Sequence, residues 1–350
     1  MRIAIASRTL VLQNAKLVLP ASVLYPGGHV PQCDNPDRNM AISTDRVRDI
    51  GIMLLIPLFF SSNIVIGRGT NGTVEPFTLA FFRWFGALLI LLPFAWSGIV
   101  ALRTGLTGEI RRIAILGFLG MWICGAMVYI ALLYTTATNG ILIYTTSPVM
   151  ILLLEAIVRH RPITLRQAVG SALAFIGAAV IVLKGNPAAI FSLNYNIGDL
   201  IILGCAFAWA VYSVLLKQED LQRFPTMPLF TSIIAAGAAC LLPFMIWETV
   251  ATGNFPATRD AWLSIAGLVF ISSILAYSSY QYGVKRFGPS LTGMMLYMLP
   301  VYGVVLSILF LGETLQLFHL VGLAMILPGV VLATLPDSMS SWRRLRFPVR

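Results

Sequence analysis

Residues 91–94 read Leu-Leu-Pro-Phe, and the same four residues return at 241–244, 150 positions further along the chain. A second set of residues repeats at a spacing of 152 positions. Its members are Pro148, Gly170 and Gly177 in the first half and Pro300, Gly322 and Gly329 in the second half. Order and spacing persist over most of each half, so the chain contains two copies of one unit.

The composition of these copies is that of a membrane protein. Of the 350 residues 58% are apolar and 11% are charged, whereas soluble domains are about 25% charged. A membrane-spanning helix needs roughly 20 residues, so the apolar residues suffice for about ten spans. Long apolar runs also exclude an outer-membrane barrel, whose strands are short and alternate in polarity.

Each copy contains five apolar runs bounded by charged, glycine, proline or turn residues. The first copy has 51–67, 76–96, 113–134, 137–158 and 165–183, and the second has 199–216, 228–247, 262–284, 290–311 and 315–335. Because five is an odd number, the second copy must enter the membrane from the opposite side. The sequence therefore predicts an all-α, polytopic membrane protein with ten transmembrane helices in two inverted five-helix repeats, a plan typical of secondary transporters.

The runs divide the chain into a leader at 1–49, a first repeat at 50–184, a second repeat at 198–335 and a basic tail at 336–350. The apolar run in residues 1–20 is broken by Lys16 and is not followed by a small-residue cleavage site, so no signal peptide is predicted. Met40 is a natural start for a chain whose first membrane helix follows directly. We expect residues 1–39 to be a disordered cytoplasmic leader or an artefact of the assigned start.

Lys and Arg residues are unevenly shared between the two sides of the membrane. If the leader is cytoplasmic, fourteen of them follow on the cytoplasmic side and three on the other side. The fourteen are Arg103, Arg111, Arg112, Arg159, Arg161, Arg166, Lys217, Arg223, Lys285, Arg286, Arg343, Arg344, Arg346 and Arg350; the three are Arg68, Lys184 and Arg259. This bias predicts an inner (plasma) membrane protein with both termini cytoplasmic. Since these cations sit in short loops, the net charge of +10 does not indicate a nucleic-acid partner.

The sequence shows no pattern of a catalytic, metal or cofactor site. The four cysteines lack CxxC spacing and are expected to be packing residues, without a disulfide or zinc site. Walker A, HExxH and GxSxG patterns do not occur, and His29, His160 and His319 lie in the leader or near span ends. We expect a protein that is not an enzyme, binds no cofactor and is not an ATP-driven pump acting alone.

Several stretches between about residues 50 and 335 resemble the EamA family of the drug/metabolite transporter superfamily. They are 60–63, 79–84, 134–138 leading to 147–148, 198–199, 209–212, and 288–289 through Pro300 to 312–313. The resemblance implies ten helices in two inverted five-helix units, secondary transport and export. In this family a Glu follows each paired proline by thirteen residues; Glu313 follows Pro300 in this way, but Arg161 stands at the position after Pro148. A symmetric role for the two acids is therefore not expected.

Polar aromatic residues well inside the spans are the main candidates for a substrate site. They are Trp122, Tyr129, Tyr144, Trp209, Tyr212, Tyr277, Tyr280 and Tyr297, to which we add Asn63 in the first span. Their spacings keep members of one helix on one face, and a buried hydroxyl or indole N–H needs a partner where water is absent. As a set they predict a central cavity; taken singly, each also fits ordinary packing between helices.

Two prolines and two charged residues complete the candidates. Pro148 and Pro300 remove a helical N–H and free the carbonyl four residues earlier, so both are expected to kink or hinge their spans. The freed carbonyls either face the substrate or are satisfied again by neighbouring Ser, Thr or water. Arg83 either serves a charge role at depth or extends toward the membrane surface, and Glu155 is favoured as the ion-pair partner of Arg159.

No acid lies at the centre of a span, so a dedicated proton relay is not visible, and a proton as coupling ion is unproven. Arg83 alone is a candidate cation at depth, which disfavours phosphate substrates and favours neutral, zwitterionic or aromatic ones. The main hypothesis is an exporter of small metabolites such as amino acids, acting within the lipid bilayer by alternating access. The alternatives are a multispecific exporter of aromatic or lipophilic cations and, from another class, a membrane-embedded enzyme or a non-transporting assembly partner.

Overall fold

The computed structural model of the protein describes residues 3–6, 9–12, 18–20, 44–70, 73–135, 137–186, 196–311 and 314–334. The chain divides into two units, 1–48 and 49–350. The first unit contains three short antiparallel strands in the order β1-β2-β3: β1 (Ile3–Ala6), β2 (Thr9–Leu12) and β3 (Val18–Pro20). The rest of the leader before residue 44, the tail at 336–350 and Glu313 lie outside the described residues.

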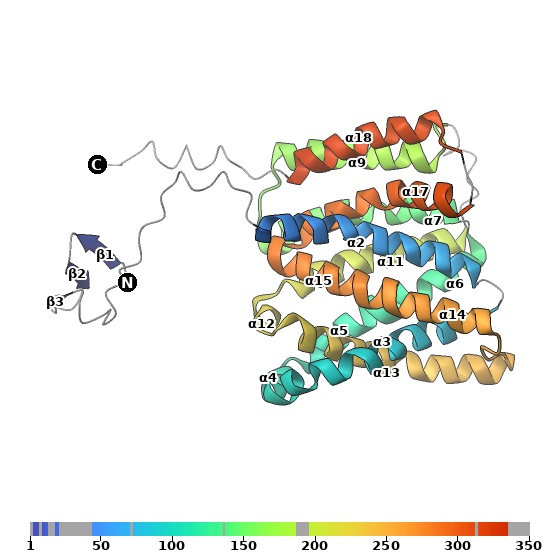
Figure 1. Cartoon of the computed structure of the whole chain (residues 1–350), viewed down its shortest axis with the longest axis horizontal. Helices are drawn as coiled ribbons and strands as arrows, with labels where there is room; N and C mark the ends of the chain where they lie inside the picture. Colours follow the sequence, from blue (N-terminus) through green and yellow to red (C-terminus); the bar gives the residue numbers. More distant parts are fainter. Residues whose placement is uncertain are drawn as a thin grey trace. The chain divides into compact units, whose positions relative to one another are not determined.

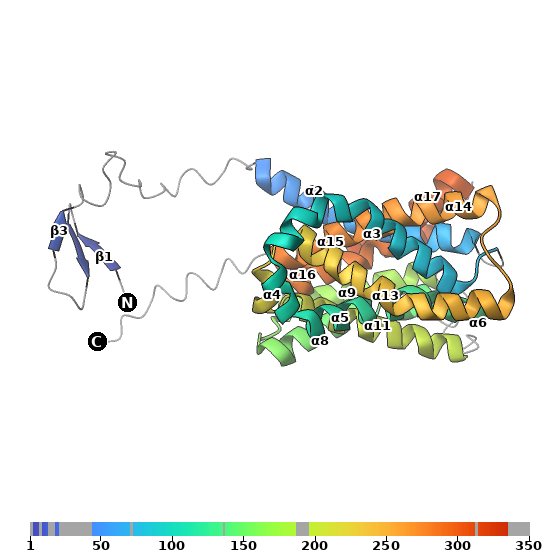
Figure 2. The same ribbon diagram turned by 90° about the horizontal axis from the view of Figure 1, so that it is seen from below.

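The second unit is a bundle of helices that run along one common direction (Figures 1 and 2). Its first half has α2 (Thr44–Gly69), α3 (Pro76–Ala101), α4 (Arg103–Gly108), α5 (Ile110–Gly117), η2 (Phe118–Met127), α6 (Val128–Tyr134), α7 (Ala137–Tyr144), α8 (Ser147–Arg159) and α9 (Leu165–Val182). Its second half has α11 (Ile197–Leu216), α12 (Glu219–Gln222), α13 (Thr226–Thr252), α14 (Arg259–Gly267), η3 (Leu268–Leu275), α15 (Ala276–Phe287), α16 (Pro289–Met294), η4 (Met295–Met298), α17 (Leu299–Leu311) and α18 (Leu317–Thr334).

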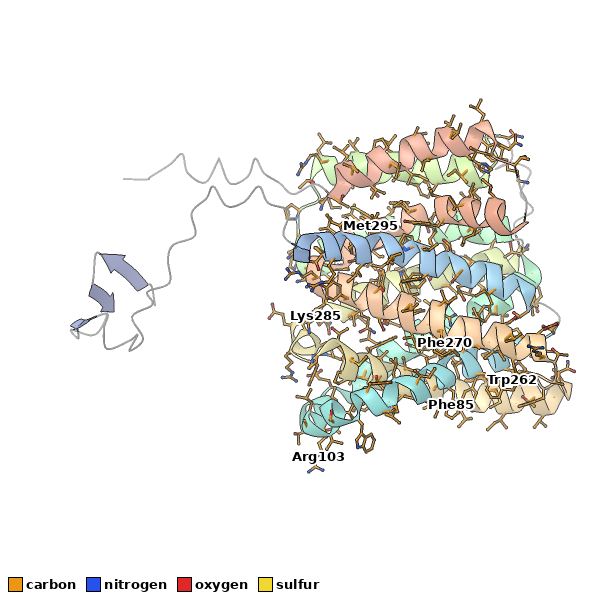
Figure 3. The ribbon with its side chains drawn as sticks, viewed as in Figure 1. Phe85, Arg103, Trp262, Phe270, Lys285 and Met295 are labelled. Atoms are coloured by element: carbon orange, nitrogen blue, oxygen red, sulfur yellow. The ribbon has the colours of Figure 1, made fainter. Side chains whose placement is uncertain are left out.

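The lengths and surfaces of these helices are those of membrane spans. Nine helical stretches within the described part of the chain are long and apolar enough to cross a membrane. The 26-residue helix α2, which carries the apolar run predicted as the first span, lies among them in the bundle (Figure 1). Large apolar side chains such as Phe85 and Phe270 are exposed on the outside of the bundle, as expected for contact with lipid (Figure 3). The predicted all-α, polytopic fold is confirmed.

The glycines that repeat between the halves pack against their own copies. Helices α9 and α18 lie side by side (Figure 1). A Cβ atom on Gly177 would lie 2.8 Å from the carbonyl oxygen of Gly322, and one on Gly170 would lie 2.6 Å from that of Gly329. Because the first glycine of α9 meets the second of α18, the two helices are antiparallel, as inverted copies require. Only residues without a side chain allow the backbones to approach this closely.

Each half also contains a π-helical segment inside its third span. Segment η2 begins at Phe118 and η3 begins at Leu268, a spacing of 150 residues that equals the spacing of the Leu-Leu-Pro-Phe repeat. Segments of π-helix are rare and are frequently found at functional sites. Their presence at equivalent positions shows that the repeat extends from sequence to irregular backbone structure.

Two helices begin where a carboxylate from the other half accepts their N-terminal amides. Glu248 of α13 accepts hydrogen bonds from the backbone N–H groups of Phe77, at 3.1 Å, and Thr78, at 2.7 Å, at the start of α3. Glu155 of α8 accepts the backbone N–H of Ser290 at 2.9 Å at the start of α16. These groups have no partner within their own helix, so the acids stabilise both the helix ends and the contact between halves.

Candidate substrate cavity

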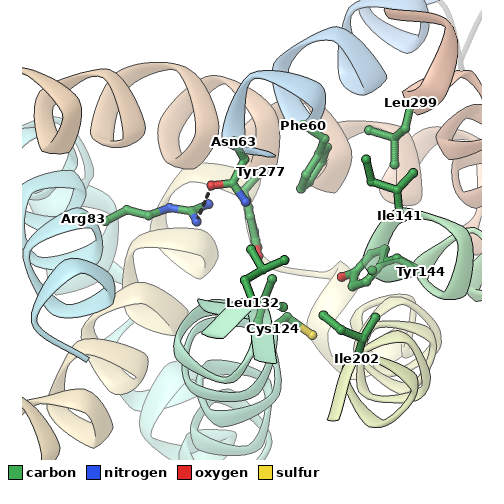
Figure 4. A pocket seen from close by; sticks show the side chains of 12 residues that line it. Phe60, Asn63, Arg83, Cys124, Leu132, Ile141, Tyr144, Ile202, Tyr277 and Leu299 are labelled. Atoms are coloured by element: carbon green, nitrogen blue, oxygen red, sulfur yellow. Dashed lines mark hydrogen bonds between the residues drawn. The ribbon is translucent and has the colours of Figure 1, made fainter. Parts of the chain in front are cut away.

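A cavity of about 80 Å³ lies inside the bundle, enough for several water molecules or part of a small ligand (Figure 4). Both halves of the chain form its wall. The first half contributes Phe60, Asn63, Arg83, Cys124, Val128, Leu132, Gly140, Ile141 and Tyr144, and the second half contributes Ile202, Tyr277 and Leu299. Of the residues predicted from the sequence, Asn63, Arg83, Tyr144 and Tyr277 lie in this wall.

Arg83 is the only charged residue in the cavity wall among the described residues, and its side chain is 1% exposed. It extends from α3 toward Asn63 of α2 (Figure 4), which accepts an Nη1–H at 3.0 Å. The hydroxyl of Tyr129 accepts the other Nη1–H at 2.9 Å and in turn donates to the side-chain oxygen of Asn63 at 3.0 Å. Arg83 therefore points into the bundle, and the alternative that it extends toward the membrane surface is wrong.

The π-helical segment η3 completes the surroundings of Arg83. The Nε–H donates to the hydroxyl of Ser273 at 2.6 Å, and an Nη2–H donates to the backbone carbonyl of Ser272 at 2.8 Å. The guanidinium carbon lies 4.8 Å from the ring centre of Trp84 and 5.9 Å from that of Tyr277, distances typical of cation–π contacts. The charge is thus held by residues of both halves, all of them neutral.

The opposite part of the wall is apolar and begins at a break in the fourth span. Helix α7 ends at Tyr144 and α8 begins at Ser147, with Pro148 as its second residue, so the break lies where the proline predicts it. Thr145 and Thr146 donate to the carbonyls of Leu142 and Ile143, each at 2.6 Å. Neither threonine hydroxyl therefore bonds the carbonyl of Tyr144 that Pro148 frees.

Pro300 takes the same place in the ninth span. It is the second residue of α17, and the 3₁₀ segment η4 precedes that helix. The backbone carbonyl of Leu299, which lines the cavity, accepts a hydrogen bond from Ser61 of α2 at 3.0 Å. Both prolines thus lie at irregular points of their spans beside the cavity.

Three further predicted residues form an aromatic cluster next to the cavity. They are Trp209, Tyr212 and Tyr280, and they pack with one another and with the cavity-lining rings of Phe60 and Tyr277 at centroid distances of 4.7 to 6.4 Å. The Tyr280 hydroxyl bonds that of Ser213 at 2.7 Å, and the Tyr212 hydroxyl accepts from Gln281 at 3.2 Å. None of the three lines the cavity itself, so they support its wall.

Two predicted substrate contacts lie away from the cavity. Trp122 packs against Phe77, Phe118 and Phe244, the last two of which are exposed on the outside of the bundle. It was expected to share a face with Tyr129, seven residues later, but the wider turns of η2 rotate the two apart. The hydroxyl of Tyr297 bonds that of Ser171 on α9 at 2.9 Å, a packing contact that sequence spacing does not reveal.

Glu155 lies at one end of the bundle and not in the cavity. Its Oε1 atom is 3.7 Å from Arg159 and 3.8 Å from Arg161, so the favoured ion pair with Arg159 is present. Its other oxygen accepts the N–H and the hydroxyl of Ser290. Burial, together with Arg159 and Arg161, lowers the pKa of nearby Lys217, which follows the end of α11. This end of the bundle therefore holds an excess of positive charge.

The sequence did not identify most of the apolar wall. Phe60, Leu132, Ile141, Ile202 and Leu299 are of the same residue types as the side chains that face lipid, so composition cannot separate the two groups. Cys124, expected to be a packing residue, lines the cavity, and Ser272, whose carbonyl binds Arg83, was not among the candidates. Among the described residues no group of three His, Cys, Asp or Glu side chains is placed to hold a metal ion.

Comparisons with known proteins agree with this architecture. An uncharacterized transporter of Bacillus subtilis, YyaM, is 28% identical over 292 residues, which cover 82% of this chain and 93% of the relative. A probable terminal-alkyne amino-acid exporter of Streptantibioticus cattleyicolor is 27% identical over 67% of this chain and 77% of its own length. A probable amino-acid metabolite efflux pump of Salmonella typhimurium is 25% identical over 47% of this chain and 56% of its own length.

A protein of known crystal structure has the same fold, with a TM-score of 0.65 and 20% sequence identity over 86% of this chain and 99% of that protein. The sequence model of the EamA-like transporter family matches twice, at residues 49–183 and 196–335. The two matches coincide with the two inverted halves that meet at the cavity. This chain belongs to the EamA-like transporter family.

Proposed function

We propose that the protein is a secondary transporter that exports small metabolites such as amino acids across the inner membrane by alternating access, with both termini in the cytoplasm. The observation that carries the proposal is one cavity inside the bundle, lined from two inverted halves. Two nearly equivalent halves can rock about such a site and open it to either side in turn. Relatives named as a probable amino-acid exporter and a probable amino-acid metabolite efflux pump support the substrate class.

The charge of the cavity wall favours this substrate class over lipophilic cations. Arg83 places a positive charge at the wall, and within the described residues no carboxylate lines the cavity. A second cation would be repelled strongly in this surrounding of low dielectric constant. Among the described residues, the wall also contains neither a histidine nor a carboxylate to serve as a general base, so it does not favour an enzyme.

The test is counterflow by the full chain in proteoliposomes. Vesicles are loaded with a mixture of unlabelled amino acids, and the accumulation of labelled ones from outside is followed. Tyr144→Ala removes a cavity-lining ring, while the matched control Tyr134→Ala removes a tyrosine that is 58% exposed on the outside. We expect the first variant to lose at least about 90% of the initial rate, in line with the tenfold effect of about 1.4 kcal/mol, and the control to keep it.

Two results would contradict the proposal. Equal transport rates for Tyr144→Ala and Tyr134→Ala would show that the cavity does not lie on the transport path. Failure of every amino acid to accumulate with the unaltered protein would contradict the substrate class, and counterflow of a lipophilic cation under the same conditions would then support the alternative exporter.

A further inference from the structure

The cavity contains a buried positive charge that the described residues do not neutralise. The four groups that accept from Arg83 are an amide oxygen, two hydroxyls and a backbone carbonyl. One of its five N–H groups has no acceptor among the described residues. A guanidinium that is 1% exposed within a membrane-spanning bundle is costly without an anion.

The buried carboxylates of the described part of the chain are all engaged elsewhere. Asp49 accepts from Tyr282 and Arg286, and Asp199 accepts from Thr135 and from the backbone of Asn196. Glu155 and Glu248 accept the N-terminal amides of α16 and α3. No described carboxylate lies within ion-pair distance of Arg83, so a ligand that carries a negative charge can supply a compensating anion.

We propose, on the basis of the proposed transport function, that Arg83 binds the carboxylate of the substrate. The apolar part of the ligand then lies against Ile141, Tyr144, Ile202 and Leu299 on the other side of the cavity (Figure 4). Guanidinium and carboxylate form short, charge-assisted hydrogen bonds that are strong where water is excluded. The substrate class is a small monocarboxylate with an apolar body.

The charge of the site argues against more highly charged anions. One guanidinium balances one negative charge, so a phosphate monoester would bring a second charge without a partner into a buried site. A primary amide of the same shape keeps the hydrogen-bonding atoms but lacks the charge, which makes it the sharpest comparison.

The binding test uses the purified full chain in detergent and three pairs of acid and amide. The acids are butanoate, 4-methylpentanoate and 3-phenylpropanoate, each compared with its primary amide. Binding is followed by tryptophan fluorescence, because Trp84 contacts Arg83 and Trp209 lies in the aromatic cluster beside the cavity. We expect at least one acid to bind about 30-fold or more tighter than its amide, as loss of one partner of a buried charge pair implies.

Variants of Arg83 test whether this residue is the source of the preference for the acid over its amide. Arg83→Gln is expected to reduce the acid-to-amide ratio to near one. Arg83→Lys is expected to reduce it in part, because lysine keeps the charge but has three donors in place of five. Since the ratio is measured within each variant, it does not depend on the yield of folded protein. The control Arg103→Gln removes an equal charge from an exposed position at the end of the bundle and should leave the ratio unchanged (Figure 3). If Arg83→Gln does not fold, the acid-to-amide ratio of Arg83→Lys is compared with that of the unaltered protein instead.

The outcomes separate this inference from the proposed function. Equal binding of acid and amide, failure of all three acids to bind, or an unchanged ratio in Arg83→Lys would overturn the carboxylate site. Counterflow of labelled leucine that persists in any of these cases would leave transport standing. A clear acid preference without any counterflow would instead support the site and contradict transport.

Discussion

At the scale of single residues, the hydrogen-bond partner of each tyrosine hydroxyl indicates whether the tyrosine packs between helices or is placed to contact substrate. The hydroxyls of Tyr280 and Tyr297 are bonded to serines on neighbouring helices, at 2.7 and 2.9 Å. The Tyr277 hydroxyl donates to the backbone carbonyl of Gly120 at 3.1 Å, although its ring lines the cavity. Tyr144 combines a place in the wall with a half-buried side chain. We therefore expect it to respond to substrate more directly than the others.

Tyr280→Phe tests this distinction. The change removes one hydrogen bond, but Ser213 keeps its bond to the carbonyl of Trp209, so unfolding should become easier by only about 0.5–1.5 kcal/mol. Counterflow should fall by well under tenfold, because Tyr280 does not line the cavity and a tenfold loss requires about 1.4 kcal/mol to act fully on binding. A normal Tm combined with loss of counterflow would show that Tyr280 contacts the substrate.

At the scale of elements, the close packing of α9 against α18 depends on glycines, which have no side chain. Gly177 and Gly322 meet with their backbones in contact, and a Cβ on Gly177 would also lie 2.8 Å from the Cβ of Met325. Contacts this short cannot be relieved by rotating a flexible side chain, because one of the atoms concerned is a backbone oxygen. The two helices must separate to admit even one methyl group.

Gly177→Ala should therefore destabilise the protein although alanine favours helices. We expect a cost of about 1–3 kcal/mol from overpacking and a fall in Tm of about 2–10 °C in detergent. The control Gly204→Ala lies in α11, where an added Cβ would meet no atom within 4 Å, and should leave Tm unchanged or raise it. Equal effects of the two substitutions would show that the close approach of α9 and α18 does not contribute to stability.

At the scale of the whole molecule, each end of the bundle carries a carboxylate contact between the two halves. Glu155 joins α8 to α16 at the end where Lys285 and Arg103 lie, and Glu248 joins α13 to α3 at the end where Trp262 lies (Figure 3). The contact with Thr78 includes both its N–H, at 2.7 Å, and its hydroxyl, at 2.9 Å. Rocking of the halves to open one end must break the contact at that end.

Thiol labelling of Cys124, which lines the cavity, reports which end opens. With the other three cysteines replaced by alanine, a membrane-impermeant maleimide is added to either face of sealed vesicles. Glu155→Gln should raise the labelling rate of Cys124 roughly tenfold only from the face of the membrane at which Glu155 lies. Glu248→Gln should do the same only from the opposite face. The reason is that hydrogen bonds to a charged group contribute about 1.5–3 kcal/mol.

Glu219→Gln, at an exposed carboxylate, is the matched control and should change neither rate. Increased labelling from both faces in either variant would indicate general loosening of the bundle. It would contradict a role of these acids in holding one end at a time.

The fold and part of the site followed from local features of the sequence. Apolar runs of membrane-spanning length and an odd number of runs per copy determine an inverted two-fold bundle, because these properties need no knowledge of tertiary contacts. Arg83 was identifiable because a charge inside an apolar run is costly and rarely accidental. The breaks beside Pro148 and Pro300 follow from the missing backbone N–H.

Only the tertiary structure decided which face of each helix meets the cavity. The turns of η2 moved Trp122 away from the face of Tyr129, because a change of helical period cannot be read from a sequence that assumes regular turns. The surroundings of Arg83 come from four separate segments, with Ser273 lying 190 residues from it along the chain. The apolar wall is made of the same residue types as the lipid-facing surface, so burial between helices, and not chemical identity, assigns each side chain to the cavity or to the membrane.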